Sequence, residues 1–201
     1  MLNLPYERQE GDYVTKEKII QAALLNFSEH GYSGGSLAQI AEEVGIRKQS
    51  IYTYFKSKDV LYLTISKQAM ETELKFAKEF IAKHQQLPVE KVLLPFLKSF
   101  QQRYESIAES KFFMRSIFLM PQHLEQQLSE QTYIYLDELE RLFTDYLKEQ
   151  QLSVSANDAA IGFLALLDSL YVEMLYGGSE RCEKRLQAGW TIFYRGIRAE
   201  V

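Results

Sequence analysis

Apolar residues recur at helical spacing along most of this chain, and no stretch shows the sustained alternation that is typical of strands. The first periodic stretch covers residues 14–29, and its apolar face consists of Ile20, Ala23, Leu24 and Phe27. The next begins at residue 36, and its apolar face consists of Leu37, Ile40, Ala41 and Val44. Both stretches repeat at i, i+3, i+4 and i+7, which predicts two amphipathic helices in succession.

Glycine and serine residues mark where these helices end and begin. Gly31 is expected to end the first helix, because glycine adopts the left-handed conformation at little cost. Ser36 is a good N-cap for the second helix, and Gly45 makes the turn into a short third helix at residues 47–54. Ser57 then begins a long fourth helix. Three helices therefore follow one another closely before a long one.

The rest of the chain also has a helical pattern. The expected ranges, including the fourth helix, are 57–83, 88–107, 109–120, 122–150, 156–176 and 179–198. Pro95 falls inside one of them, so that helix either kinks or begins later. The pattern as a whole predicts an all-α fold of about nine helices.

The third helix is locally basic in an acidic chain. The formal net charge is -4, yet residues 45–58 hold four basic residues and no acidic one. In a helix-turn-helix, the second helix enters the major groove of DNA while the first crosses the backbone. A capped helix, a glycine turn and a basic, aromatic helix in this order predict a three-helix DNA-binding head. The alternative is an ordinary solvated helical hairpin with surface charge.

Two groups of residues would contact double-stranded DNA. Arg47, Lys48 and Gln49 begin the third helix, where Arg and Lys can pair with guanine and Gln with adenine. Other residues have hydroxyls or charges suited to phosphate contacts, which set register rather than sequence. They are Ser36, Ser50, Tyr52, Tyr54 and Lys58.

Residues 15–63 resemble the DNA-binding head of the tetracycline-repressor (TetR) family of bacterial transcription regulators. The matching residues include Ala23, Phe27, Gly31, Tyr32, Ser36, Ile40, Ala41, Gly45, Ile46, Ile51 and Leu61. The most specific match is the pattern Tyr-x-x-Phe-x-Ser-Lys, formed by Tyr52, Phe55, Ser57 and Lys58. Gly35 and Gln49 depart from the family pattern, in which a Thr or Ser and a small residue are usual.

The resemblance implies a ligand-responsive regulator, a repressor that binds a near-palindromic operator as a homodimer and is released by a small molecule. It also implies two domains. Residues 1–60 would be the helix-turn-helix DNA-binding domain, and residues 61–201 would be a helical ligand-binding and dimerisation domain.

Aromatic and methionine residues of the C-terminal part suit an adaptable apolar pocket. The candidate ligand-binding residues are Phe112, Phe113, Met114, Phe118, Tyr133, Tyr171, Glu173 and Met174. Any of the apolar residues could equally belong to the core of a helical bundle. Glu173 could receive a cationic aromatic ligand such as a lipophilic dye, or it could pair with a basic residue at the helix surface.

The last two expected helices have the features of a dimer surface. Small and apolar residues in 159–176 allow close helix approach, and Leu166 and Phe193 are taken as interface residues on the two helices. Burial of these residues within one subunit is the alternative.

Composition and motifs narrow the class of protein. A hydrophobic share of 46 % excludes a disordered chain. No apolar run approaches the roughly 18 to 20 residues that span a bilayer, so no membrane contact is expected. The N-terminus lacks a secretory signal pattern. Cys182 is the only cysteine, which excludes an intrachain disulfide and suits a cytoplasmic protein.

Motifs of catalysis are also missing from the sequence. The three histidines are far apart, and the chain has neither a Gly-rich phosphate loop nor a G-x-S-x-G motif. We therefore expect no enzyme, no catalytic or metal residues and no cofactor. A helical adaptor without a DNA role is the second hypothesis, but it leaves Arg47, Lys48, Tyr52 and Tyr54 without a purpose.

Overall fold

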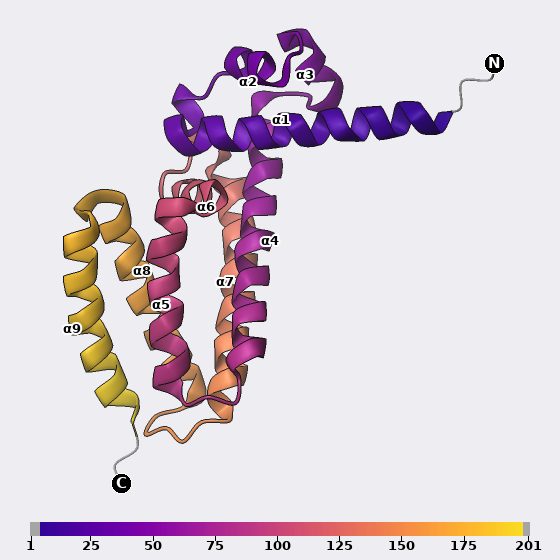
Figure 1. Ribbon diagram of the computed structural model, residues 1–201. Coiled ribbons are helices and arrows are strands. Elements are labelled where there is room, and N and C mark those ends of the chain that lie inside the picture. Colours follow the sequence, from indigo (N-terminus) through magenta and orange to yellow (C-terminus); the bar gives the residue numbers. More distant parts are fainter. Residues whose placement is uncertain (1–4, 199–201) are drawn as a thin grey trace.

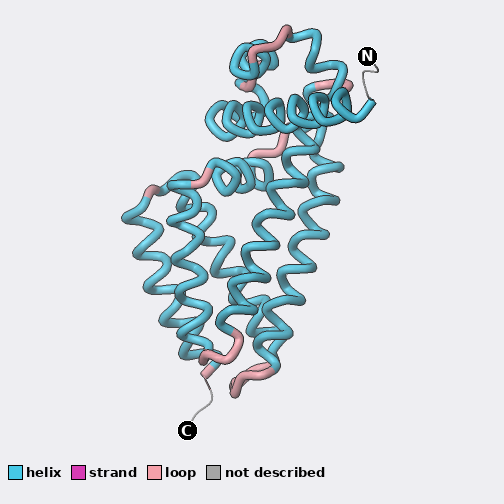
Figure 2. Tube along the Cα trace, turned by 45° about the vertical axis from the view of Figure 1, so that its right-hand side comes forward, coloured by secondary structure: helices cyan, strands magenta, loops and turns pink. Residues whose placement is uncertain are grey.

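The computed structural model describes residues 5–198, with side chains at Tyr13 and from Thr15 onward. This part of the chain contains nine α-helices and no β-strand, which confirms the all-α expectation. The helices are α1 (Pro5–Gly34), α2 (Leu37–Val44), α3 (Lys48–Tyr54), α4 (Lys58–His84), α5 (Val89–Ser106), α6 (Ala108–Phe118), α7 (Glu125–Lys148), α8 (Ala156–Val172) and α9 (Ser179–Ile197). A 3-10 turn, η1 (Gln122–Leu124), precedes α7, and a π-helical turn, η2 (Glu173–Gly177), follows α8. Short loops join them (Figure 2).

A small head lies across one end of a longer helical bundle (Figure 1). α1 crosses the bundle, α2 and α3 pack on its outer side, and α6 lies beneath it. α4 leaves the head and runs down the bundle beside α7. α5, α8 and α9 complete the bundle, with α9 on the side away from α4. α4 is therefore one continuous helix that connects the head to the bundle.

One apolar core holds the head together. Ile19 and Phe27 on α1 have no exposed surface, because the helical repeat places them on the same face. Ile40 of α2 and Ile51 of α3 are each 1 % exposed in the same cluster. The Tyr62 ring of α4 lies edge-on to Phe27, with ring centroids 5.2 Å apart. The core thus ties the head to the start of α4.

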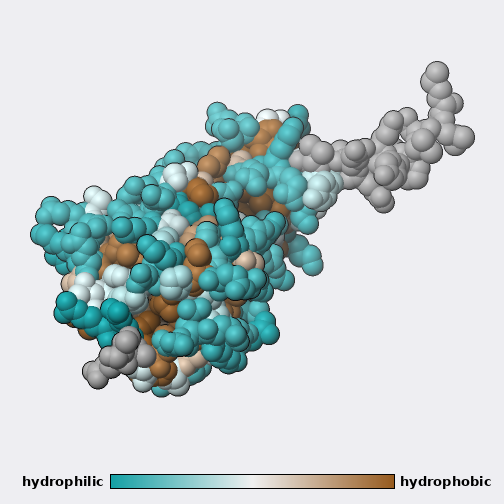
Figure 3. Space-filling model, turned by 60° about the horizontal axis from the view of Figure 1, so that its bottom comes forward, coloured by the Kyte–Doolittle hydropathy of each residue, from teal (hydrophilic) through white to brown (hydrophobic). Residues whose placement is uncertain are grey.

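Aromatic rings fill the centre of the bundle. Phe96 of α5, Phe143 of α7 and Phe163 of α8 have no exposed surface. The ring centroids of Phe96 and Phe143 are 4.9 Å apart, and those of Phe143 and Phe163 are 4.7 Å apart. Aromatic pairs at such distances add stability beyond the burial of their surface. The face seen in Figure 3 is largely hydrophilic, and hydrophobic patches interrupt it.

The segment Ala156–Gly177 is long and apolar enough to cross a membrane, judged by length and composition. The expectation that no apolar run reaches this length was therefore wrong. Of its most apolar window, 56 % is buried within the protein, and α8 packs against α7 and α9. Burial at the centre of the bundle accounts for this composition.

Two helices begin or continue differently from the expectation. α1 begins at Pro5, well before residue 14, and proline is favoured in the first turn of a helix. Its helical geometry is interrupted at Gly31, where φ is 65° and ψ is -174°. α5 begins at Val89 and continues through Pro95 as one helix.

Candidate nucleic-acid interface

Local hydrogen bonds fix the angle between α2 and α3. The Ser36 hydroxyl caps α2 by accepting from the Gln39 backbone N–H at 3.4 Å. Gly45 closes α2 in the left-handed conformation, with φ 75° and ψ 29°. This conformation costs a residue with a side chain about 1 to 2 kcal/mol. Ile46 N–H then donates to the Ala41 carbonyl at 2.9 Å, which completes the turn into α3.

The turn between α1 and α2 depends on close contacts of Gly35. A Cβ atom at this position would lie 2.3 Å from the Phe27 ring, which explains why a glycine stands where Thr or Ser was expected. The Gly35 carbonyl accepts a hydrogen bond of 2.8 Å from the Lys58 ammonium. That ammonium also lies 4.4 Å from the centre of the Tyr32 ring. Lys58, predicted to contact phosphate, therefore also holds the head together, and burial lowers its pKa.

The outer face of α3 carries the residues predicted to contact bases. Arg47, Lys48 and Gln49 are exposed, whereas Ile51 is buried beneath them. Within the part of the chain that the structure describes, neither Arg47 nor Lys48 forms an ion pair. Tyr52 is 49 % exposed. The cationic groups of this short helix are thus presented to the outside.

The remaining predicted DNA contacts are more sheltered. Ser36, Ser50 and Tyr54 are half-buried around the ends of α2 and α3. Thr53 is also exposed on α3. It lies four residues after Gln49 and therefore on the same helix face.

A polar contact joins the head to the bundle where α1, α4 and η1 meet. The Tyr32 hydroxyl donates to the Asp59 carboxylate, and His123 Nε2 lies 3.3 Å from Asp59 Oδ1 and 3.2 Å from Tyr32 Oη. We call these three residues the clasp. Burial and the bond to Asp59 raise the pKa of Tyr32 to about 12. The bond from Tyr32 lowers the pKa of Asp59.

A row of rings continues this link into the bundle. The Tyr62 ring contacts Tyr32 of the clasp at 5.2 Å between centroids and Phe112 of α6 at 5.3 Å. Phe112 was predicted to bind ligand, but it sits on the path between head and bundle. Ring contacts therefore connect α6 with the head.

The other predicted ligand residues are only partly brought together. Phe113 and Phe118 lie edge-on to Tyr171, with centroids 6.3 Å and 5.8 Å away. Met114 and Met174 are buried. Tyr133 does not join them, because its position on α7 leaves it 67 % exposed.

Glu173 lies apart from this aromatic cluster. Its carboxylate accepts from Arg181 Nε at 2.9 Å and from Arg185 Nη2, both on α9. These hydrogen bonds, the Arg181 bond first, lower the pKa of Glu173. Of the two placements open from the sequence, the structure thus has the pairing with basic residues, although Glu173 is 4 % exposed and does not lie at the helix surface.

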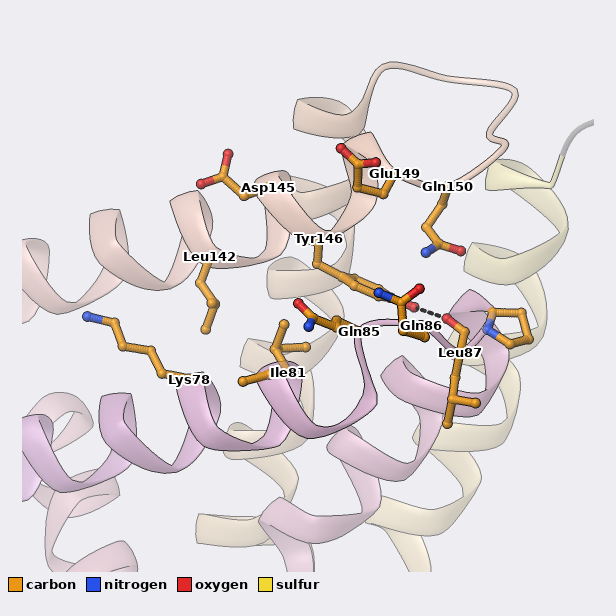
Figure 4. A pocket seen from close by; sticks show the side chains of 12 residues that line it. Lys78, Ile81, Gln85, Gln86, Leu87, Leu142, Asp145, Tyr146, Glu149 and Gln150 are labelled. Carbon is orange, nitrogen blue, oxygen red and sulfur yellow. Dashed lines mark hydrogen bonds between the residues drawn. The ribbon is translucent and has the colours of Figure 1, made fainter.

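A groove of about 670 Å³ lies where α4 and α7 end and α5 begins (Figure 4). Polar groups such as those of Lys78, Asp145 and Glu149 line it. The Tyr146 hydroxyl crosses between its walls and donates to the Leu87 carbonyl at 3.0 Å. None of the residues predicted from the sequence lines this groove.

Known proteins match the head in sequence. Residues 19–65 fit the sequence profile of bacterial regulatory proteins, tetR family. The HTH-type transcriptional regulator RutR of Escherichia coli (strain K12) is 40 % identical over 65 residues, or 32 % of this chain and 31 % of RutR. The biofilm operon icaADBC HTH-type negative transcriptional regulator IcaR of Staphylococcus aureus (strain Newman) is 49 % identical over 47 residues, or 23 % of this chain and 25 % of IcaR. The matched part thus spans less than a third of either relative.

The fold of the whole chain also has a known counterpart. A transcriptional regulator of the TetR family from Agrobacterium tumefaciens superposes with a TM-score of 0.72 at 17 % identity. The superposition covers 92 % of this chain and 99 % of that one. At this identity the likeness shows the fold alone. It concerns the architecture of the bundle as well as that of the head.

Proposed function

Because this chain belongs to the tetR family of bacterial regulatory proteins, we propose that it is a transcriptional repressor that binds a near-palindromic DNA operator as a homodimer. In this proposal the head up to residue 60 reads DNA, and residues 61–201 bind the effector and form the dimer. RutR and IcaR are regulators of transcription, and the chain accordingly is not assigned an enzyme activity.

The observation that carries this proposal is the exposed face of α3. Arg47, Lys48 and Gln49 are exposed side by side, and the buried Ile51 anchors the helix that bears them. Side chains at the start of a recognition helix reach base edges, while hydroxyls and ammonium groups around it bind phosphates. We assign the phosphate contacts to Ser36, Ser50, Tyr52, Tyr54 and Lys58.

An electrophoretic shift with the DNA that flanks the chain's own gene tests this proposal. The protein should retard one flanking fragment at concentrations that leave random DNA free. Binding should weaken steeply with salt, because each neutralised phosphate releases counterions. Equal retardation of all fragments, or binding that salt does not change, would favour the helical adaptor over the repressor.

Support for a homodimer comes from the outer faces of α8 and α9. Ile161 and Val172 on α8 are each 46 % exposed, and Ile192 on α9 is 74 % exposed. Exposed aliphatic residues gathered on neighbouring helices are typical of a surface that another protein covers. Leu166 is not part of this surface, because it is 9 % exposed and packs against Gly189 of the same subunit. Phe193 is half-buried. We therefore choose Ile192, in place of Leu166 and Phe193, as the residue whose substitution tests the interface.

The effector in this proposal is a small, largely apolar molecule that binds within the bundle and releases DNA. The support is the aromatic cluster of Phe113, Phe118 and Tyr171 and the contact of α6 with both head and bundle. Release requires only that the effector favours one dimer geometry over another by about 1 to 3 kcal/mol. Thermal-shift screening followed by DNA-release assays is the test, and stabilising compounds that leave DNA affinity unchanged would refute this role.

A further inference from the structure

The outer face of α8 carries one charge in a strip of otherwise uncharged residues. The strip follows the helical repeat and is exposed in the single chain; its members are Ile161, Ala165, Asp168 and Val172. Asp168 forms no ion pair with any residue that the structure describes. A carboxylate that an interface covers is costly unless a cation meets it. A second copy that covers this strip must therefore bring a cation to Asp168.

The outer face of α9 carries cations. The exposed residues on one side of this helix are Lys184, Ala188, Ile192 and Arg195. Lys184 and Ala188 also line a groove of about 530 Å³ between α8 and α9. The surface that two copies would share thus combines aliphatic residues with a carboxylate on one helix and cations on the other.

Lys184 is the cation of this region that is free to change its partner. Arg181 and Arg185, its neighbours on α9, both donate to the buried carboxylate of Glu173. Lys184 pairs with Glu180 at 3.0 Å, and these two side chains are 75 % and 85 % exposed. An exposed pair within one helix contributes little free energy, so exchanging it for another carboxylate costs little.

Contacts within one chain give the relative heights of residues on the two helices. α8 and α9 form an antiparallel hairpin (Figure 1), and a Cβ atom at Gly189 would lie 2.4 Å from Leu166 Cδ1. Asp168, two residues after Leu166, is therefore level with residue 187, two residues before Gly189. Lys184 is three residues from that level. At a rise of about 1.5 Å per residue this is about 4.5 Å along the axis, which a lysine side chain spans.

The symmetry of the proposed dimer determines which heights meet. Both heads must reach the same DNA molecule, so the two-fold axis points toward the head and runs along the bundle (Figure 1). Rotation about such an axis keeps each residue at its height, and it places α8 of one copy opposite α9 of the other. Asp168 of each copy would then lie opposite Lys184 of the other, and the contact would occur twice.

We propose that Asp168 of one copy pairs with Lys184 of a second copy, and that these two contacts select a second copy of this chain as the partner. The inference rests on the proposed homodimer and adds the residues that set its register and its choice of partner. Charged residues beside an apolar helix interface have this effect in coiled coils, because they make wrong pairings repulsive.

Charge reversal in two separate chains tests the pairing. Asp168→Lys and Lys184→Glu each create two like-charge contacts in their own homodimer, so each dissociation constant should rise about a hundredfold in sedimentation equilibrium. In an equal mixture the two variants should form the heterodimer, because both of its contacts are attractive again. Native mass spectrometry with one variant labelled with nitrogen-15 distinguishes the three dimers.

Lys75→Glu is the matched control for the lysine. Lys75 of α4 is also 75 % exposed and also pairs with a glutamate four residues away, Glu79. Lys75→Glu should leave the homodimer as tight as the wild type. Its mixture with Asp168→Lys should contain no more heterodimer than random exchange gives.

A variant without a reversed charge separates pairing from misfolding. Asp168→Asn keeps the shape of the side chain and should melt like the wild type at a concentration where both are monomers. Its dimer dissociation constant should rise about fivefold for each contact, or about 25-fold in all. A dissociation constant equal to that of the wild type would overturn the inference.

Failure of this inference differs from failure of the proposed function. A wild type that is monomeric, or one that stays dimeric with Ile192→Asp, refutes the proposed interface. A wild-type dimer that Ile192→Asp dissociates, but that Asp168→Asn leaves equally tight or whose charge-reversed variants show no preference for the heterodimer, refutes this inference alone.

Discussion

At the scale of single residues, we propose that the three side chains at the start of α3 read DNA, whereas the buried Ile51 holds the helix in place. Arg47, Lys48 and Gln49 contribute nothing visible to the head core, so their replacement should act on DNA alone. Each alanine variant should cost about 1 to 3 kcal/mol of binding to the operator and change the base preference.

The measurement is fluorescence anisotropy with operator DNA and with random DNA of equal length. Lys91→Ala, which removes an exposed cation of α5, serves as the control and should change neither affinity. If the three variants lost affinity for both DNAs to the same degree, these residues would be phosphate contacts and not base contacts.

Lys58 and Lys56 are neighbours with different expected roles. The Lys58 ammonium donates to the Gly35 carbonyl, whereas Lys56 is exposed. Lys58→Ala should lower the free energy of unfolding by about 1.5 to 3 kcal/mol, the range for a hydrogen bond of a charged group. Lys56→Ala should leave it unchanged. Urea denaturation of both variants measures this difference. Equal stability of the two variants would show that Lys58 does not stabilise the head.

At the scale of elements, the glycine turn sets how α3 is presented. Gly45→Ala places a side chain at φ 75° and should destabilise the head by about 1 to 2 kcal/mol. Gly196→Ala in α9 is the matched control, because a Cβ there meets no atom within 4 Å. It should be neutral or stabilise by up to about 1 kcal/mol. In thermal unfolding Gly45→Ala should melt below the wild type and Gly196→Ala should not, and equal destabilisation by the two variants would contradict the role of the turn.

The clasp makes the junction of head and bundle sensitive to acid. The hydrogen bond from Tyr32 holds the pKa of Asp59 below its ordinary value of 3.8. A carboxyl with a lower pKa in the folded chain stabilises it above the unfolded pKa, and this contribution is lost as pH falls through the folded pKa. The melting temperature of the wild type should therefore exceed that of Asp59→Asn above about pH 5, and the gap should shrink below pH 4.

A control for this pH dependence is Asp137→Asn, which changes an exposed carboxylate of α7. Its melting curve should follow that of the wild type at every pH. If the difference in melting temperature between the wild type and Asp59→Asn widened on acidification, the pH dependence would have the opposite sign. That result would refute an ionised Asp59 in the clasp.

Local signals made α2 and α3 predictable from the sequence, because Ser36 and Gly45 act on the residues next to them. The start of α1 was not predicted, because the helix begins at Pro5 and the apolar repeat begins only at residue 14. The clasp could not be foreseen, because His123 is 64 residues from Asp59 and only the packing of α6 under α1 brings them together. Pairing of Glu173 with a basic residue was one of the two alternatives open from the sequence, but its partners Arg181 and Arg185 depend on how the chain runs through the π-helical turn.

At the scale of the whole molecule, the outer faces of α8 and α9 should hold two subunits together. Ile192→Asp would bury a charge in that interface and should give monomers. Ile134→Asp changes an isoleucine of α7 that is 67 % exposed, and this variant should remain a dimer. Sedimentation velocity distinguishes these outcomes. If both variants remained dimers, the interface would not include Ile192 of α9.

The central claim is that two copies of α3 read one DNA site together. Hydroxyl-radical footprinting of the full chain on its operator tests it most directly. Two protected stretches should appear about one helical turn, 10 to 10.5 base pairs, apart or somewhat more, and Ile192→Asp should weaken both together. A single protected stretch that Ile192→Asp leaves intact would contradict the claim.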